Sequence, residues 1–122
     1  MAVHGLGSLV FWTSQLATCR AFYEALGFEF EDEEHEEGPL HFACEVGGVH
    51  FAIYEGPPGV AANKGQGASS LIGFKVDDVD AVFGRLCSFE TEVLWEPRAA
   101  PWGRTAQLRD PDGRPVEIFQ PR

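Results

Sequence analysis

Two stretches of the chain repeat one order of secondary-structure signals, and this repeat restricts the fold more than any other feature. A β-rich run begins at Ser8 and leads into an amphipathic segment that ends at Leu26. A second β-rich run begins at Leu71 and leads into an amphipathic segment that starts at Val79. Equivalent points lie roughly 63 residues apart, and further strand signals follow each segment. One half alone cannot bury both faces of its sheet, so we expect the halves to pair in an α+β fold.

Both amphipathic segments have apolar residues at the i, i+3, i+4 and i+7 positions of a helix with one buried face. These residues are Cys19, Phe22, Tyr23 and Leu26 in the first segment and Val79, Val82, Phe83 and Leu86 in the second. Gly27 can end the first helix, and Asp77 or Asp78 can cap the second. We therefore predict helices over residues 16–26 and 79–89.

Two turn signals predict the hairpins that complete each half. Gly47-Gly48 separates strand signals over 40–46 and 49–55. The run Asp-Pro-Asp-Gly at 110–113 separates strand signals over 104–109 and 114–119. The 122 residues are thus predicted to form a single domain, 1–122, with module one at about 6–56, a linker at about 57–69 and module two at about 70–121.

Three motifs support this division. They are AFYEALGF at 21–28, FKVDDV at 74–79, and Trp102-Gly103 followed by DPDGRPVE at 110–117. The chain resembles the vicinal oxygen chelate superfamily in these motifs, a group that includes glyoxalases, bleomycin resistance proteins and extradiol dioxygenases. The resemblance implies two βαβββ modules that form a cupped, partly open mixed sheet with helices on its outer face. It leaves function open, because the superfamily contains both enzymes and non-enzymatic drug binders.

The resemblance also implies where metal ligands would lie, at the start of the first strand and in the last strand of each module. Counted along this chain, those positions are Ser8, Leu71, Ala52 and Glu117. Only Glu117 is a usual ligand, whereas a catalytic site needs about three protein ligands. His41 and His50 lie roughly 13 Å apart along the predicted hairpin, so they cannot share an ion. We predict no metal and no other cofactor, with a divalent metal as the alternative.

Strand alternation separates two faces of the first hairpin. One face, with Phe42, Phe51 and Ile53, is apolar throughout and is expected to pack on the helices. The other is polar and aromatic and is expected to line the cup, unless it is simply exposed to solvent, as one side of an antiparallel sheet often is. The predicted ligand-binding residues are Ser8, Trp12, His41, His50 and Tyr54 from module one and Leu71, Trp102 and Glu117 from module two.

Two acidic residues that are predicted to face the cup allow more than one role. Glu117 could accept a hydrogen bond, pair with a cationic ligand or act as a base, or it could pair with an arginine such as Arg104 or Arg109. Glu45 lies opposite His50 in the predicted hairpin, which favours an ordinary cross-strand pair over a catalytic dyad.

The charge of the chain narrows the class of partner. Nine basic and nineteen acidic residues give a net charge of −10, which disfavours nucleic acid and anionic membrane surfaces. The acidic run 29–37, which includes His35, is typical of a solvated loop but could also steer a cationic ligand. Three cysteines without paired spacing indicate reduced thiols, and no leader or membrane-spanning segment is evident, so we expect a cytoplasmic protein.

These patterns favour a small-molecule-binding protein of the glyoxalase/bleomycin-resistance type that works without a metal and sequesters an aromatic or cationic ligand. The alternative is a metal-dependent lyase, isomerase or dioxygenase of the same superfamily, so whether the protein is an enzyme stays open. The resemblance further implies a homodimer, since members often dimerise and some place modules of two chains around each cup.

Overall fold

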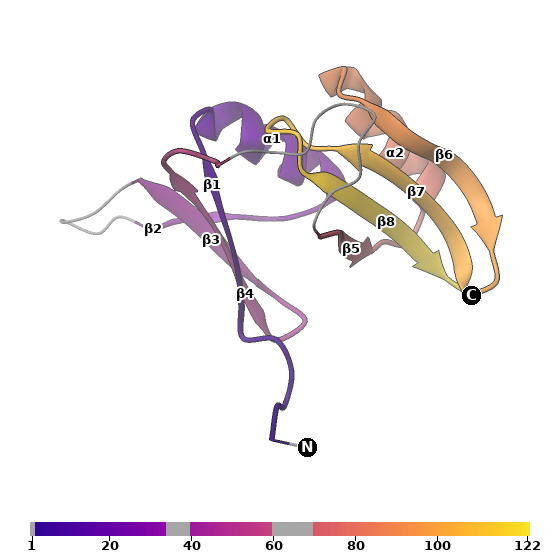
Figure 1. Cartoon of the computed structure of the whole chain (residues 1–122), viewed down its shortest axis with the longest axis horizontal. Coiled ribbons are helices and arrows are strands. Elements are labelled where there is room, and N and C mark those ends of the chain that lie inside the picture. Colours follow the sequence, from indigo (N-terminus) through magenta and orange to yellow (C-terminus); the bar gives the residue numbers. More distant parts are fainter. Residues whose placement is uncertain (1, 34–39, 60–69) are drawn as a thin grey trace.

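The computed structural model describes residues 2–33, 40–59 and 70–122, which form two modules of the same design (Figure 1). Module one contains β1 (Ser8–Thr13), α1 (Leu16–Leu26), β2 (Glu31–Glu33), β3 (His41–Val46) and β4 (Val49–Glu55). Module two contains β5 (Ile72–Lys75), α2 (Val79–Leu86), the 3-10 turn η1 (Cys87–Phe89), β6 (Val93–Ala100), β7 (Gly103–Arg109) and β8 (Pro115–Pro121). Each module follows the βαβββ order, which confirms the predicted α+β class. Most of the predicted linker, residues 60–69, and part of the acidic run with His35 lie outside the described residues.

Each module has its own four-stranded mixed sheet. Sheet one has the order β1-β4-β3-β2 and sheet two the order β5-β8-β7-β6. In each sheet the first strand of the module runs parallel to the last, and the other pairings are antiparallel. The predicted register of the first hairpin is confirmed, with Glu45 opposite His50 and His41 opposite Tyr54.

The helices begin and end as their sequences predict. Asp78 caps α2, because its Oδ1 atom accepts a hydrogen bond from the Ala81 backbone N–H at 3.1 Å. Gly27 ends α1 with a φ of 134°, which a residue with a side chain rarely adopts. The second helix is shorter than predicted, since residues 87–89 form the 3-10 turn instead.

Two strands lack a clear strand signal of their own in the sequence, and only the resemblance implied them. The first is β6, in which Pro97 interrupts the apolar pattern and the pairing with β7 shifts register twice, between Val93 and Trp95 and between Trp95 and Arg98. Proline is tolerated there because β6 is an edge strand. The second is β2, which consists of three acidic residues and has no apolar alternation. Irregular or very short edge strands carry little of the period-two signal on which strand prediction depends.

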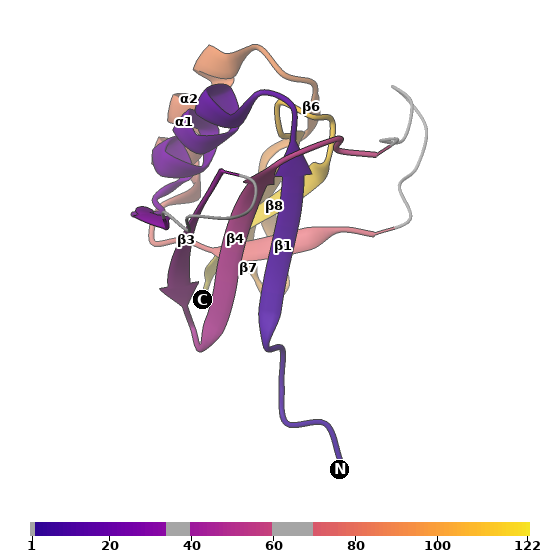
Figure 2. The ribbon, with the colours of Figure 1, turned by 90° about the vertical axis from the view of Figure 1, so that its left-hand side faces the viewer.

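One hydrophobic core serves both modules. Its buried members come from α1, α2 and the helix-facing sides of both sheets. Aromatic contacts cross the module boundary, with ring centroids 6.0 Å apart for Phe51 and Phe74 and 5.1 Å apart for Phe28 and Phe74. The two helices lie side by side (Figure 2). The face of each sheet opposite the helices, here called its open face, therefore points away from the shared core.

This arrangement differs from a single cup within the chain. The strands form two separate sheets rather than one continuous sheet. Both sheets turn their apolar faces toward the same core, so their open faces cannot enclose a common hollow in one copy of the chain. Among the described residues, no helix is long and apolar enough to cross a membrane.

Candidate functional site

An aromatic row crosses the open face of sheet one. The strand register places Trp12, Tyr54 and His41 side by side on β1, β4 and β3. The Trp12 and Tyr54 rings are stacked with centroids 6.3 Å apart, and the Tyr54 and His41 rings lie nearly parallel at 4.3 Å. Trp12 is 49% exposed, whereas His41 is 7% exposed. The exposed half of the Trp12 indole thus offers a flat apolar surface on which an aromatic ring can stack.

A polar row crosses the same face near the Gly47-Gly48 turn. The register places Ser8, His50 and Glu45 side by side on β1, β4 and β3. His50 Nδ1 and Glu45 Oε1 are 2.7 Å apart, so the predicted cross-strand pair is present. Both side chains are substantially exposed, so water screens their attraction and the pair adds little to stability.

Small side chains separate the two rows. Between them the register places Val10, Ala52 and Ala43 side by side. The two alanines are buried, at 1% and 2% exposed. The rows are four residues apart along β3 and β4, which corresponds to roughly 13 Å. We call this strip of the open face the slot.

Glu117 lies on the open face of sheet two. Its Oε2 atom accepts a hydrogen bond from Gln107 Nε2 at 3.2 Å. Gly73 stands beside it in the register, and a Cβ atom there would lie 3.4 Å from Glu117 Oε1. The two arginines considered as partners of Glu117 contact other carboxylates: Arg104 donates to Asp80 and Arg109 donates to Glu92.

The eight predicted site residues therefore fall into two groups. Ser8, Trp12, His41, His50 and Tyr54 share the open face of sheet one. Glu117 belongs to the open face of sheet two, Leu71 precedes β5, and Trp102 lies in the turn between β6 and β7; the last two are exposed. That the groups serve one ligand site stays a prediction.

Two residues outside the predicted ligand-binding set also lie on the open face of sheet two. The guanidinium carbon of Arg98 lies 3.8 Å from the centroid of the Trp95 ring, a cation–π contact on β6. Trp95 and Arg98 pair with Gln107 and Thr105 of β7. The register shifts of β6 hide this placement from a strict period-two pattern.

The side chains at the superfamily's ligand positions do not fit a metal ion. The register puts Ala52 beside Val10 in module one and Glu117 beside Gly73 in module two, so Ala52 and Glu117 are equivalent positions. The first-strand positions are occupied by a serine and a leucine. A single carboxylate with a hydroxyl is too poor a donor set for a catalytic divalent ion.

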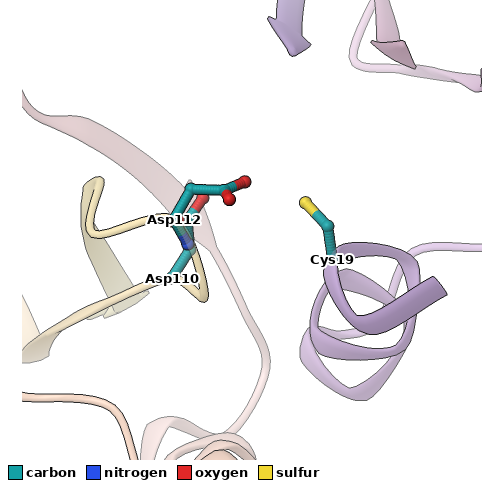
Figure 3. Close-up of side chains that lie close together, drawn as sticks. All are labelled: Cys19, Asp110 and Asp112. Atoms are coloured by element: carbon teal, nitrogen blue, oxygen red, sulfur yellow. The ribbon is translucent and has the colours of Figure 1, made fainter. Parts of the chain in front are cut away.

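One other cluster contains metal-binding residue types. Donor atoms of Cys19, Asp110 and Asp112 all lie within 4.8 Å of one another (Figure 3). Metal binding requires the thiolate, yet burial, together with the charge of Asp110, raises the pKa of Cys19 to about 12. The two carboxylates already accept hydrogen bonds from Arg114 Nη1 at 2.9 and 3.1 Å. The geometry is that of a structural contact rather than of an open metal site.

This contact joins the modules. Tyr23 of α1 donates to Asp110 at 2.7 Å, and Gln15 Nε2 donates to the Pro111 carbonyl at 2.9 Å. Arg114 donates to the Trp12 carbonyl and lies over the Phe11 ring, with its guanidinium carbon 4.5 Å from the ring centroid. The turn between β7 and β8 is thus fastened to the end of β1 and to α1. We call this group of contacts the latch.

Comparison with solved structures identifies proteins of similar fold. TnmS3, an antibiotic binding protein from Streptomyces sp. CB03234, is 28% identical over 100% of this chain and 99% of its own, with a TM-score of 0.66. FosX, a fosfomycin resistance protein from Listeria monocytogenes, is 18% identical over 98% and 95%, with a TM-score of 0.73. A glyoxalase/bleomycin resistance protein/dioxygenase family enzyme from Burkholderia phytofirmans PsJN is 17% identical over 98% and 100%, with a TM-score of 0.70.

The last two similarities establish the fold alone. No curated protein matches the sequence. The sequence profile of one family matches residues 5–118, nearly the whole chain. This match, together with the two βαβββ modules, shows that the chain belongs to the Glyoxalase/Bleomycin resistance protein/Dioxygenase superfamily.

Proposed function

We propose that the protein binds a small aromatic molecule on the open face of sheet one without using a metal ion. The observation that carries this proposal is the aromatic row of Trp12, Tyr54 and His41, with Trp12 left half-exposed. Aromatic pairs of this kind add about 0.5–1.5 kcal/mol beyond the burial of their area, so a flat ligand gains by extending the row. The similarity to TnmS3 supports a binding role.

Charge favours a ligand that is neutral or cationic. Residues 1–59 contain one basic and ten acidic residues, a net charge of −9, whereas residues 70–122 contain seven and nine, a net charge of −2. A ligand that approaches module one therefore meets a negative potential, which attracts cations and repels anions. The position of Glu45 beside the slot adds a carboxylate at one end.

A second copy of the chain would complete the site. The open face of each sheet points away from the other module of the same chain. A cup therefore requires sheet one of one copy to meet sheet two of another copy. Pairing sheet one with itself would bring two strongly acidic modules together, whereas pairing with sheet two brings Lys75 and Arg98 toward the acidic face. We therefore infer a twofold homodimer in which Glu117 of the partner subunit faces the slot.

Ligand binding is tested by a thermal-shift screen of aromatic and cationic compounds. A ligand present at 100 times its Kd stabilises the protein by about 2.7 kcal/mol, which the screen detects readily. Trp12→Ala should weaken each hit, whereas Leu6→Ala, in the exposed N-terminal segment, should not. No stabilisation by any compound would contradict the proposal.

Two further measurements separate the remaining parts of the proposal. Light scattering should give twice the monomer mass of 13.4 kDa, and a monomer at micromolar concentration would contradict the dimer. Elemental analysis should find no stoichiometric nickel, zinc, manganese or iron after dialysis. A retained metal would instead favour the metal-dependent lyase, isomerase or dioxygenase alternative.

A further inference from the structure

A cavity of about 380 Å³ lies where the two modules meet. Its walls come from Gln15 and Thr18 at the start of α1, from residues 89–92 in and after η1, and from residues 109–111 with Gly113 in the turn between β7 and β8. Figure 1 shows this turn beside α1. None of these lining residues belongs to the aromatic row, the polar row or the slot. The cavity is thus separate from the site proposed above, and its volume falls within the range of small-molecule sites.

Hydrogen bonds hold the walls of the cavity in place. Arg109 is almost completely buried, and its Nε and Nη1 atoms donate to Glu92 Oε2 at 2.9 Å and to the Gly113 carbonyl at 2.8 Å. Gln15 Nε2 donates to the Pro111 carbonyl at 2.9 Å and so ties the wall from module one to the wall from module two. The cavity is therefore preformed, and a ligand does not have to order its walls when it binds.

The charged groups around the cavity leave one carboxylate without a counter-charge. Three acidic residues and one arginine line it. Asp110 is paired with Arg114 at 2.9 Å, and Glu92 is paired with Arg109. Glu90 is exposed, and among the described residues its carboxylate forms no ion pair or hydrogen bond. The cavity therefore attracts a cation and repels an anion.

Two neighbouring residues of the wall are unfavourable for folding alone. Glu90 has a φ of 57° and a ψ of 32°, a left-handed conformation that no other described residue except glycine shares in the sign of φ. The Thr91 hydroxyl oxygen is buried and has no hydrogen-bond partner within the described part of the chain. Strained backbone and unpaired buried polar groups are both concentrated at functional sites. These features support a role in binding for this wall.

We propose that the cavity is a second binding site, which takes a small organic cation with its ammonium group against Glu90. An ammonium group supplies both the missing counter-charge and hydrogen-bond donors for the carboxylate. Phe89 and Pro111 supply apolar surface in the same walls for the hydrocarbon part of the ligand. The ligand class is therefore a compact primary amine. This proposal does not depend on the one made for the open face of sheet one.

Cyclohexylamine and cyclohexanol are matched probes for the charge requirement. They have the same ring, and at pH 7.5 only the amine is charged, as a lysine side chain is. NMR titration of the full-length protein with cyclohexylamine should shift the amide resonances of Thr91 and Gly113 and leave those of His50 and Tyr54 in place. The Kd should be about 3- to 10-fold lower for the amine, between the effects of an exposed ion pair and of a charged hydrogen bond.

Three variants locate the charge that the amine recognises. Glu90→Gln keeps the shape of the side chain and should bring the two Kd values within about twofold of each other. Glu96→Gln, at an exposed position on β6 outside the cavity, is the matched control and should retain the full preference for the amine. Glu90→Gly should also lose the preference, yet its thermal unfolding midpoint should be at or above that of the wild type, because glycine adopts the left-handed conformation readily.

Each result bears on a different part of the proposal. Equal affinity of the wild type for the two probes, or amide shifts confined to the open face of sheet one, would overturn the cation site. A preference that survives in Glu90→Gln would overturn the role of Glu90. A lower midpoint in Glu90→Gly would show that this side chain stabilises the fold and would overturn the argument that it is kept for binding. Neither probe is aromatic, so these results leave the function proposed for the aromatic row to its own thermal-shift screen.

Discussion

The buried hydrogen bond between Tyr23 and Asp110 predicts a measurable stability cost for Tyr23→Phe. Both side chains are almost completely buried, and the Tyr23 hydroxyl donates to Asp110 Oδ2 at 2.7 Å. Burial, reinforced by the charge of Asp110, raises the pKa of Tyr23 well above its ordinary value, so the hydroxyl remains a donor throughout the usual pH range. Replacement by phenylalanine removes only the oxygen and keeps the ring, which contacts Phe51 and Phe74 in the core.

The expected cost is about 1.5–2 kcal/mol, the lower part of the range for a hydrogen bond to a charged group. The lower part applies because Asp110 keeps three donors, the backbone N–H groups of Asp112 and Arg114 and the Arg114 guanidinium. With a urea m-value near 2 kcal/mol/M, the unfolding midpoint should fall by roughly 1 M.

Tyr54→Phe provides the matched control, since the chain has two tyrosines. Tyr54 lies on the open face, and its hydroxyl has no hydrogen-bond partner among the residues that the structure describes. Its replacement should change the free energy of unfolding by less than about 0.5 kcal/mol. Urea unfolding followed by circular dichroism checks both variants. Equal, small effects of the two substitutions would refute the assignment of the latch as a stabilising contact between the modules.

Three further predictions follow from contacts elsewhere. Iodoacetamide at pH 8 should alkylate the exposed Cys87 and spare Cys19, whose pKa burial raises to about 12; rapid modification of Cys19 in a peptide mass map would contradict this. Arg104 donates to both carboxylate oxygens of Asp80, at 2.6 and 3.0 Å, and holds the pKa of Asp80 below 3.8. In Arg104→Gln the NMR titration midpoint of Asp80 should rise. Because the pKa of Asp80 is lower in the folded chain than in the unfolded chain, its ion pair with Arg104 stabilises the fold at pH values above the unfolded pKa. This contribution disappears as the pH falls through the pKa of Asp80 in the folded chain. Gly84→Ala should raise the free energy of unfolding by about 0.5–1 kcal/mol, since a Cβ there meets nothing within 4 Å on a helix, and a lower thermal midpoint would count against it.

Local patterns predicted most of the individual elements. The i, i+3, i+4, i+7 spacing predicted α1, because the same residues that produce the pattern are the ones that the fold buries. The Gly47-Gly48 turn and the alternation on both sides of it predicted the register of β3 and β4, which in turn placed His41 beside Tyr54. The nearly parallel stacking of these two rings depends on side-chain rotamers, which strand alternation does not determine.

The relative placement of the modules depends on contacts that no local pattern encodes. Alternation shows which face of each sheet is apolar. A cup formed within one chain and a cup formed between two chains would both bury those apolar faces. Whether the open faces meet within one chain depends on where Phe74 packs and on what the turn between β7 and β8 contacts. In this chain Phe74 packs against Phe28 and Phe51, and Arg114 reaches the carbonyl of Trp12.

Those contacts have a consequence for binding. Arg114 is held by the buried Asp110 and by Asp112, and it donates to the backbone of Trp12, whose side chain forms the exposed end of the aromatic row. The latch therefore supports the face that carries the proposed site while it turns the open face of sheet two away from that face. Because the same contacts do both, the proposed cup would take its opposite wall from the second copy of the proposed homodimer. Weakening the latch and weakening ligand binding should accordingly go together, even though Arg114 does not itself lie in the slot.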